Sequence, residues 1–94
     1  MTAITLPKQI IISNDVLFQI LDNEYVLLQT QTERYFGLDA VAARFWQLFS
    51  DGLSTSLAVD VILTEYEIDR ETVEKDLGNL LQKLEKDQLV TLKN

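Results

Sequence analysis

Hydrophobic and polar positions follow a strand-like pattern in the first forty residues and a helical pattern afterwards. Residues 16–21 (VLFQIL) and 25–30 (YVLLQT) are rich in strand-forming side chains, and DNE separates them. Asp and Asn tolerate tight turns and positive φ, so these two segments predict a β-hairpin. A second turn at 31–34 then leads to a third short strand at 34–38.

Both faces of this hairpin are largely apolar. Val16, Phe18 and Ile20 point to one side of the first strand, whereas Leu17 and Leu21 point to the other. A sheet with one side in water normally alternates between apolar and polar residues. Since this one does not, we expect that something covers part of each face.

Three helices are expected after the strands. Asp39 is a good N-cap for the first, because its carboxylate can accept the free N–H groups of the first turn, and Gly52 ends that helix. The second begins at Ser54 or Thr55 and ends near Tyr66. Apolar residues recur at helical spacing in the first helix, at Val41, Ala42, Phe45, Trp46, Leu48 and Phe49.

The third helix begins at the N-cap Asp69, and its apolar side chains form one stripe. Residues 10–13 (IIIS) predict a short extended piece, and residues 89–92 (LVTL) predict a short closing strand. The stripe on the third helix consists of Val73, Leu77, Leu80, Leu81 and Leu84.

Strands grouped before helices predict an α+β fold, in which a three-stranded antiparallel sheet is followed by three helices. These are the parts of a winged helix-turn-helix in permuted order. We expect one winged-helix domain over residues 14–94, preceded by an N-terminal extension over residues 1–13 that is partly flexible.

Composition argues against catalysis. The 94 residues include no Cys and no His, so disulfides, cysteine-ligated metals and the commonest general base are unavailable. We therefore expect no enzyme activity, cofactor or metal. Three carboxylate pairs are interpreted as parts of solvated helix faces; these are Glu65 with Glu67, Asp69 with Glu71, and Glu74 with Asp76.

The charge balance bears on the choice of partner. Fifteen acidic residues against eight basic ones give a net charge of −7, whereas a protein that binds nucleic-acid phosphates needs clustered Lys and Arg. We expect no nucleic-acid partner, although a winged-helix DNA-binding regulator stays an alternative on fold grounds. No signal peptide or long apolar segment is recognisable, so we expect a cytoplasmic protein without membrane contact.

The third strand suggests a different partner. In a three-strand meander it lies at an edge, where unpaired N–H and C=O groups can bind an extended peptide. Residues 33–37 (ERYFG) contain no proline to block such pairing. A proline at Phe36 is expected to prevent it. A structural dimerisation domain, in which the same edge or residues 10–13 pair with a second copy, is the alternative.

The stretch VLLQTQTERYFGLDAVAARFWQLF resembles the PqqD family, also called RiPP recognition elements. Members typically have a Val-Leu-Leu strand, here residues 26–28, and an Arg-Tyr-Tyr/Phe-Gly-Leu-Asn/Asp corner, here residues 34–39. A helix ending near a tryptophan follows, here with Phe-Trp at 45–46, and a long third helix has an Asp-Leu step, here at 76–77. The likeness covers about residues 14–92.

The resemblance implies a non-catalytic peptide chaperone. Family members bind the leader of a ribosomally made precursor peptide, which adds as an antiparallel strand to the third strand and lies against the third helix. The precursor is then presented to a modifying enzyme such as a radical SAM protein, a leader peptidase or a cyclase. Carried over to this chain, the peptide-binding residues are Glu33, Arg34, Tyr35, Phe36, Gly37, Leu38, Glu74, Asp76, Leu77, Asn79, Leu80 and Lys83.

One departure from the family concerns the expected groove. Gly78 stands inside the third helix where larger aliphatic residues are common in the family. A glycine there costs roughly 0.5–1 kcal/mol relative to alanine. Either another chain approaches closely at this point or the residue packs tightly within the protein.

Overall fold

The computed structural model of the chain describes residues 6–94. The predicted order of three strands followed by three helices is confirmed, and so is the α+β fold with an antiparallel three-stranded sheet. The name winged helix-turn-helix stays a prediction. The elements are β1 (Gln9–Ile12), β2 (Val16–Leu21), β3 (Glu24–Gln29), β4 (Arg34–Leu38), α1 (Ala40–Ser50), α2 (Thr55–Glu65), α3 (Arg70–Lys86) and β5 (Val90–Lys93).

The main sheet has the order β2-β3-β4, so β4 is an edge strand, as the sequence predicted. Leu21 pairs with Glu24 around a two-residue turn in which Asp22 and Asn23 both have positive φ, 50° and 68°. Positive φ at both central positions is the geometry whose twist suits a tight hairpin, which explains why Asp and Asn stand there.

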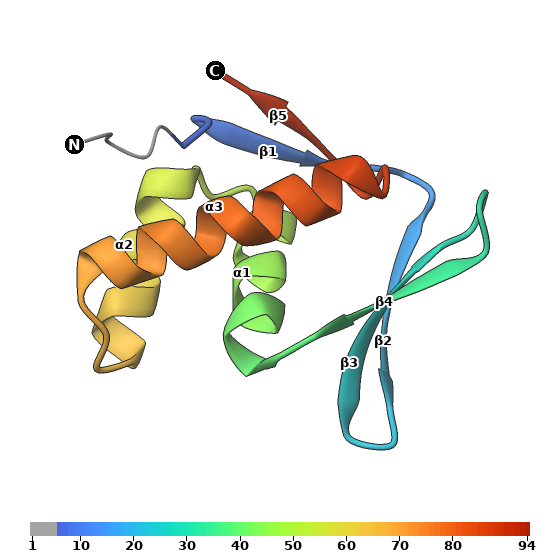
Figure 1. Cartoon of the computed structure of the whole chain (residues 1–94), viewed down its shortest axis with the longest axis horizontal. Helices are drawn as coiled ribbons and strands as arrows, with labels where there is room; N and C mark the ends of the chain where they lie inside the picture. The colour runs from blue at the N-terminus through green and yellow to red at the C-terminus, as the bar shows by residue number, and fades with distance from the viewer. Residues whose placement is uncertain (1–5) are drawn as a thin grey trace.

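A second, two-stranded sheet joins the ends of the chain. β1 pairs antiparallel with β5, placing Ile10 opposite Leu92 and Ile12 opposite Val90, and the pair lies beside α3 (Figure 1). The sequence predicted both extended pieces but not their pairing. β1 falls within the predicted extension 1–13, whose residues 1–5 lie outside the described residues. Where that extension ends stays a prediction.

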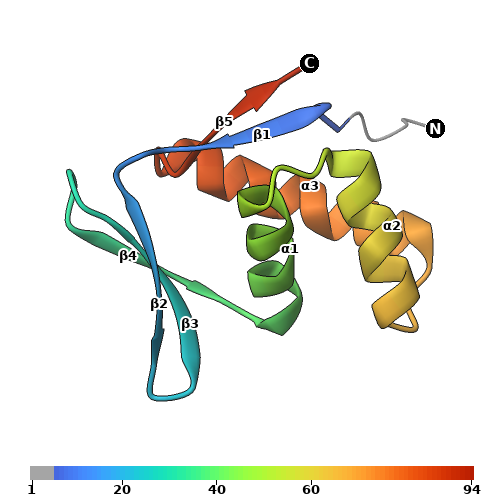
Figure 2. The same ribbon diagram turned by 180° about the vertical axis from the view of Figure 1, so that it is seen from behind.

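The three helices form most of the core, and Figure 2 shows them together, to one side of the main sheet. Asp39 and Asp69 are N-caps, as predicted, and Ser54 caps α2, which begins at Thr55. In residues 6–94, no helix is long and apolar enough to cross a membrane. The largest fully buried side chains are Phe45, Leu27, Ile62, Leu77, Leu81, Leu84, Leu89 and Val59.

The main sheet projects from this helical body (Figure 1). Its inner face carries Leu27, which is fully buried, and Leu38. On its outward face, Leu17 and Leu21 are 48% and 46% exposed. Within the described part of the chain, no element covers this outward face, so the cover expected from the sequence is not supplied by residues 6–94. The β2–β4 sheet therefore offers an apolar surface as well as an edge.

The cap at the start of α1 is testable. The Asp39 carboxylate accepts the Ala42 N–H at 2.8 Å. Replacing an N-cap Asp by alanine typically costs about 1 kcal/mol, whereas Asn caps nearly as well. Asp39→Ala should therefore lower the free energy of unfolding in urea by about 1 kcal/mol, and Asp39→Asn should leave it near the wild-type value. Equal losses in both variants would contradict the capping role.

Candidate functional site

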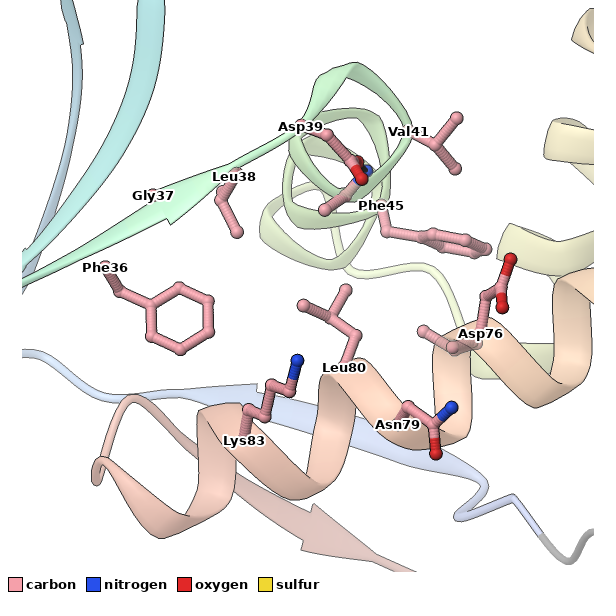
Figure 3. A pocket seen from close by; sticks show the side chains of 12 residues that line it. Phe36, Gly37, Leu38, Asp39, Val41, Phe45, Asp76, Asn79, Leu80 and Lys83 are labelled. Carbon is pink, nitrogen blue, oxygen red and sulfur yellow. Dashed lines mark hydrogen bonds between the residues drawn. The ribbon is translucent and has the colours of Figure 1, made fainter.

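A groove lies between the edge strand β4 and helix α3 (Figure 3). Its volume is about 460 Å³, within the roughly 300–1,000 Å³ of ordinary ligand pockets. The first turns of α1 close one end. We call it the β4–α3 groove; its lining residues are Phe36, Gly37, Leu38, Asp39, Val41, Ala42, Phe45, Asp76, Leu77, Asn79, Leu80 and Lys83.

The floor of the β4–α3 groove is apolar. Leu38, Phe45 and Leu77 are buried, so they belong to the core as much as to the groove. Phe36 and Leu80 are half-buried, and Figure 3 shows them projecting from β4 and α3 into the same space. An apolar side chain placed between them would leave water, which contributes roughly 25 cal/mol per Å² of buried apolar surface.

The rim of the groove is charged, and its negative and positive side chains lie toward opposite ends. Asp39 and Asp76 lie toward the end near Phe45, whereas Lys83 lies beside Phe36 at the other end (Figure 3). All three charged residues are exposed. None of the three takes part in an ion pair among the described residues.

The register identifies which backbone groups of β4 face the open edge. The Gln29 carbonyl accepts the Glu33 N–H at 2.8 Å, on the β4 side, whereas the Thr30 N–H donates to the Asp15 carbonyl at 2.8 Å, on the β2 side. Gln29 pairs with Arg34, and orientation alternates along an antiparallel strand. The N–H and C=O of Arg34, Phe36 and Leu38 therefore point to β3.

By the same alternation, the N–H and C=O of Tyr35 and Gly37 point away from β3 to the open edge. Phe36 is thus unsuitable for a proline test of edge pairing, because its N–H lies on the β3 side. The informative positions are Tyr35 and Gly37. A side chain added at Gly37 would meet no heavy atom within 4 Å.

Most of the predicted site residues line the groove, namely Phe36, Gly37, Leu38, Asp76, Leu77, Asn79, Leu80 and Lys83. The other four lie outside its lining. Glu33 is in the turn before β4, with φ 59°, and Arg34 begins the strand. The Tyr35 side chain is 65% exposed on the outward face. Glu74 lies 3.7 Å from Arg70 and lines a different hollow. Their roles in binding stay predictions.

Sequence reasoning missed the contribution of α1. Asp39, Val41, Ala42 and Phe45 line the groove but were expected only to cap the helix or fill the core. The signal was present in the sequence, because only Asp39 separates β4 from α1. This short connection places the first turn of α1 at the end of the groove.

Gly78 does not line the β4–α3 groove. It lies half-buried along a separate hollow between α3, the N-terminal segment and β5, beside Leu6, Pro7 and Leu92. Its position therefore excludes Gly78 from the lining of the β4–α3 groove, and the two explanations offered for this glycine stay predictions.

One buried polar side chain holds the sheet against α3. Gln29, on the inner face of β3, is only 3% exposed. Its Nε2 donates to the backbone carbonyl of Gln88 at 2.8 Å, and its Oε1 accepts the Gln31 N–H at 3.0 Å. Gln88 follows the C-terminus of α3 and has φ 62°. The bond therefore fixes the distance between the sheet and the end of α3.

Several carboxylates outside the groove have structural partners. A bidentate hydrogen bond from Arg44, with contacts of 2.8–3.2 Å, lowers the pKa of Glu65. The Thr72 hydroxyl donates to Asp69 at 2.7 Å and lowers the pKa of that carboxylate. A general acid at neutral pH needs a raised pKa. Among the described residues, no group of three or more metal-ligating side chains is present.

The bond between Gln29 and Gln88 predicts a stability effect. Gln29→Leu removes the donor of a part-buried hydrogen bond, and such a bond typically contributes about 0.5–1.5 kcal/mol. The free energy of unfolding in urea should fall by this amount. Gln88→Gly is the matched control, because it keeps the backbone acceptor and suits positive φ. Loss of stability in the control but not in Gln29→Leu would contradict this role.

Comparison with known proteins gives the family. The model of coenzyme PQQ synthesis protein D (PqqD) matches residues 24–90. The structure "TbiB1 in Complex with the TbiA(beta) Leader Peptide" is 45% identical, with a TM-score of 0.78, covering 85% of this chain and 93% of that one. Lasso peptide synthetase B1 complexed with the leader peptide shares the fold at 24% identity and a TM-score of 0.79, covering 88% and 98%. Among curated proteins, none matches in sequence. The chain belongs to the PqqD family.

Proposed function

We propose that this chain is a non-catalytic chaperone that binds the leader of a ribosomally made precursor peptide. The leader adds as a strand to β4 and places alternate side chains in the β4–α3 groove. The observation that carries the proposal is an open strand edge next to an apolar groove. The 45% identity to TbiB1, whose complex contains a leader peptide, supports the same class of ligand.

Strand addition divides the task between backbone and side chains. The N–H and C=O groups of Tyr35 and Gly37 would give affinity that depends little on peptide sequence. Peptide residues opposite Phe36 and Leu38 would point into the groove, because paired residues of adjacent strands share a face. Those opposite Tyr35 would point outward. The groove between Phe36 and Leu80 would select an apolar residue.

The bound precursor would then be passed to an enzyme. We propose a leader peptidase, a cyclase or a radical SAM protein as the modifying partner, acting in the cytoplasm where a ribosomally made peptide is first available. The chain itself would contribute binding and presentation, with no catalytic residue. It would raise the local concentration of the precursor at the enzyme.

The alternative to a leader peptide is a second copy of this chain, which would pair with the same edge and form a homodimer. The exposed apolar residues Leu17, Leu21 and Tyr35 lie on the outward face beside this edge, and an uncovered sheet face often marks an interface. Sedimentation equilibrium separates the two cases. Under the leader-binding proposal, the chain sediments as a monomer, or its dimer dissociates when leader is added. A dimer that persists in saturating leader, with β4 at its seam, would refute the proposal.

The backbone role of β4 is tested with two substitutions of one residue. Tyr35→Pro removes an edge N–H and should weaken binding about tenfold or more, because a hydrogen bond is lost and the proline ring obstructs the approaching strand. The probe is the synthetic TbiA(beta) leader, labelled for fluorescence anisotropy. Proline is tolerated where the N–H of an edge strand faces solvent, so the variant should fold.

Tyr35→Ala is the matched control, because it truncates the same side chain but keeps the N–H. It should bind much more tightly than Tyr35→Pro, and circular dichroism should show both variants folded. If Tyr35→Pro is folded and binds the leader as well as Tyr35→Ala does, strand addition to β4 is excluded.

A further inference from the structure

The charges along the β4–α3 groove have an order. Asp39 follows the C-terminal end of β4, and Asp76 lies on α3 on the other side of the Phe45 side chain (Figure 3). Lys83 lies at the other end of the groove, beside Phe36. Arg34, at the N-terminal end of β4, is on the same sheet face as Phe36, because residues two apart in a strand share a face. One end of the groove is therefore acidic and the other basic.

The separation of these charges matches a short extended peptide. Asp76 and Lys83 are seven positions apart in α3, which corresponds to about 10 Å along the helix. Leu38 and Arg34 are four positions apart in β4, which corresponds to about 13 Å. A five-residue strand paired with β4 would thus extend from the acidic end to the basic end.

Direction follows from antiparallel pairing, which the β2–β4 sheet already uses throughout. A peptide added to β4 in the same sense would begin beside Leu38 and end beside Arg34. Its first, third and fifth residues would face the groove, because the side-chain period of a strand is two. The first would lie near Asp39 and Asp76, the third opposite Phe36, and the fifth near Arg34 and Lys83.

We propose that the groove recognises leader segments by the order of their charges, and this rests on the proposed function. The preferred segment has a basic residue first, an apolar residue two positions later and an acidic residue two positions after that. The net charge of −7 would favour any cationic peptide. The basic end of the groove adds a preference that net charge cannot supply, namely for one direction of the sequence.

The test uses two displayed peptide libraries of identical composition. One has the pattern Lys-X-apolar-X-Glu, and the other has Glu-X-apolar-X-Lys, with randomised X and flanking positions. Exposed ion pairs are each worth at most about 1 kcal/mol, or about fivefold. The wild-type chain should enrich the Lys-first library several-fold over the Glu-first library, and the ratio should approach one as salt rises.

A charge-exchange variant assigns the preference to named residues. Asp76→Lys combined with Lys83→Glu leaves the net charge unchanged and alters only exposed side chains. It should abolish or reverse the preference for the Lys-first library. The matched control is Lys75→Glu combined with Glu85→Lys. These residues line a hollow away from the groove on the same helix, so the control should keep the wild-type preference.

The outcomes separate the two proposals. If wild-type protein enriches both libraries equally, and more strongly than Tyr35→Pro does, strand addition stands and charge order is refuted. A preference for the Glu-first library, or an unchanged preference in the Asp76→Lys/Lys83→Glu variant, also refutes it. Enrichment of neither library above the level of Tyr35→Pro counts against peptide binding at this edge altogether.

Discussion

A single hydrogen bond between β3 and the residue after α3 sets the distance on which the site depends. The Gln29 side chain, which is itself only 3% exposed, crosses 59 positions of sequence to reach the carbonyl of the exposed residue Gln88. A buried side-chain amide without a partner is costly, so the Gln29 amide favours this contact. At the opposite end, β4 continues into α1 through Asp39. These two connections join β3 to the end of α3 and β4 to the start of α1, at opposite ends of the β4–α3 groove.

Stability and recognition reside in different parts of this small chain. Apolar burial is concentrated among the helices, the β1–β5 pair and the inner face of the main sheet. By contrast, the edge strands β2 and β4 keep exposed apolar side chains, namely Leu17, Ile20 and Leu21 in β2 and Tyr35 in β4. A strand edge that was covered would stabilise the chain but could not accept a peptide. The uncovered sheet is therefore consistent with binding as its role.

Two sets of charged side chains can be distinguished by their partners. Glu65, Asp69 and Asp60 are each engaged by a neighbouring arginine or hydroxyl group, and they hold helix ends and helix pairs together. Asp76 and Lys83 have no such partner among the described residues and border the groove. Exposed charges of this kind add little to folding stability. Under the proposed function, Asp76 and Lys83 would affect which peptide enters and in which direction.

The sequence alone determined the local features of this protein. Asp22 and Asn23 specify the hairpin turn, the caps Asp39 and Asp69 specify where helices begin, and the corner at 34–39 carries the family resemblance. These are short-range effects of side chains on nearby backbone. Most of the groove residues were predicted because the resemblance named one strand and one helix face.

Only the tertiary structure decided how distant segments combine. The pairing of β1 with β5, the bond from Gln29 to Gln88 and the groove between β4 and α3 all join residues far apart in sequence. Strand register decided that Tyr35 and Gly37, and not Phe36, present the free edge, since a shift by one residue would exchange the two sets. Local pattern cannot specify these features, because each depends on which surfaces meet when the chain packs.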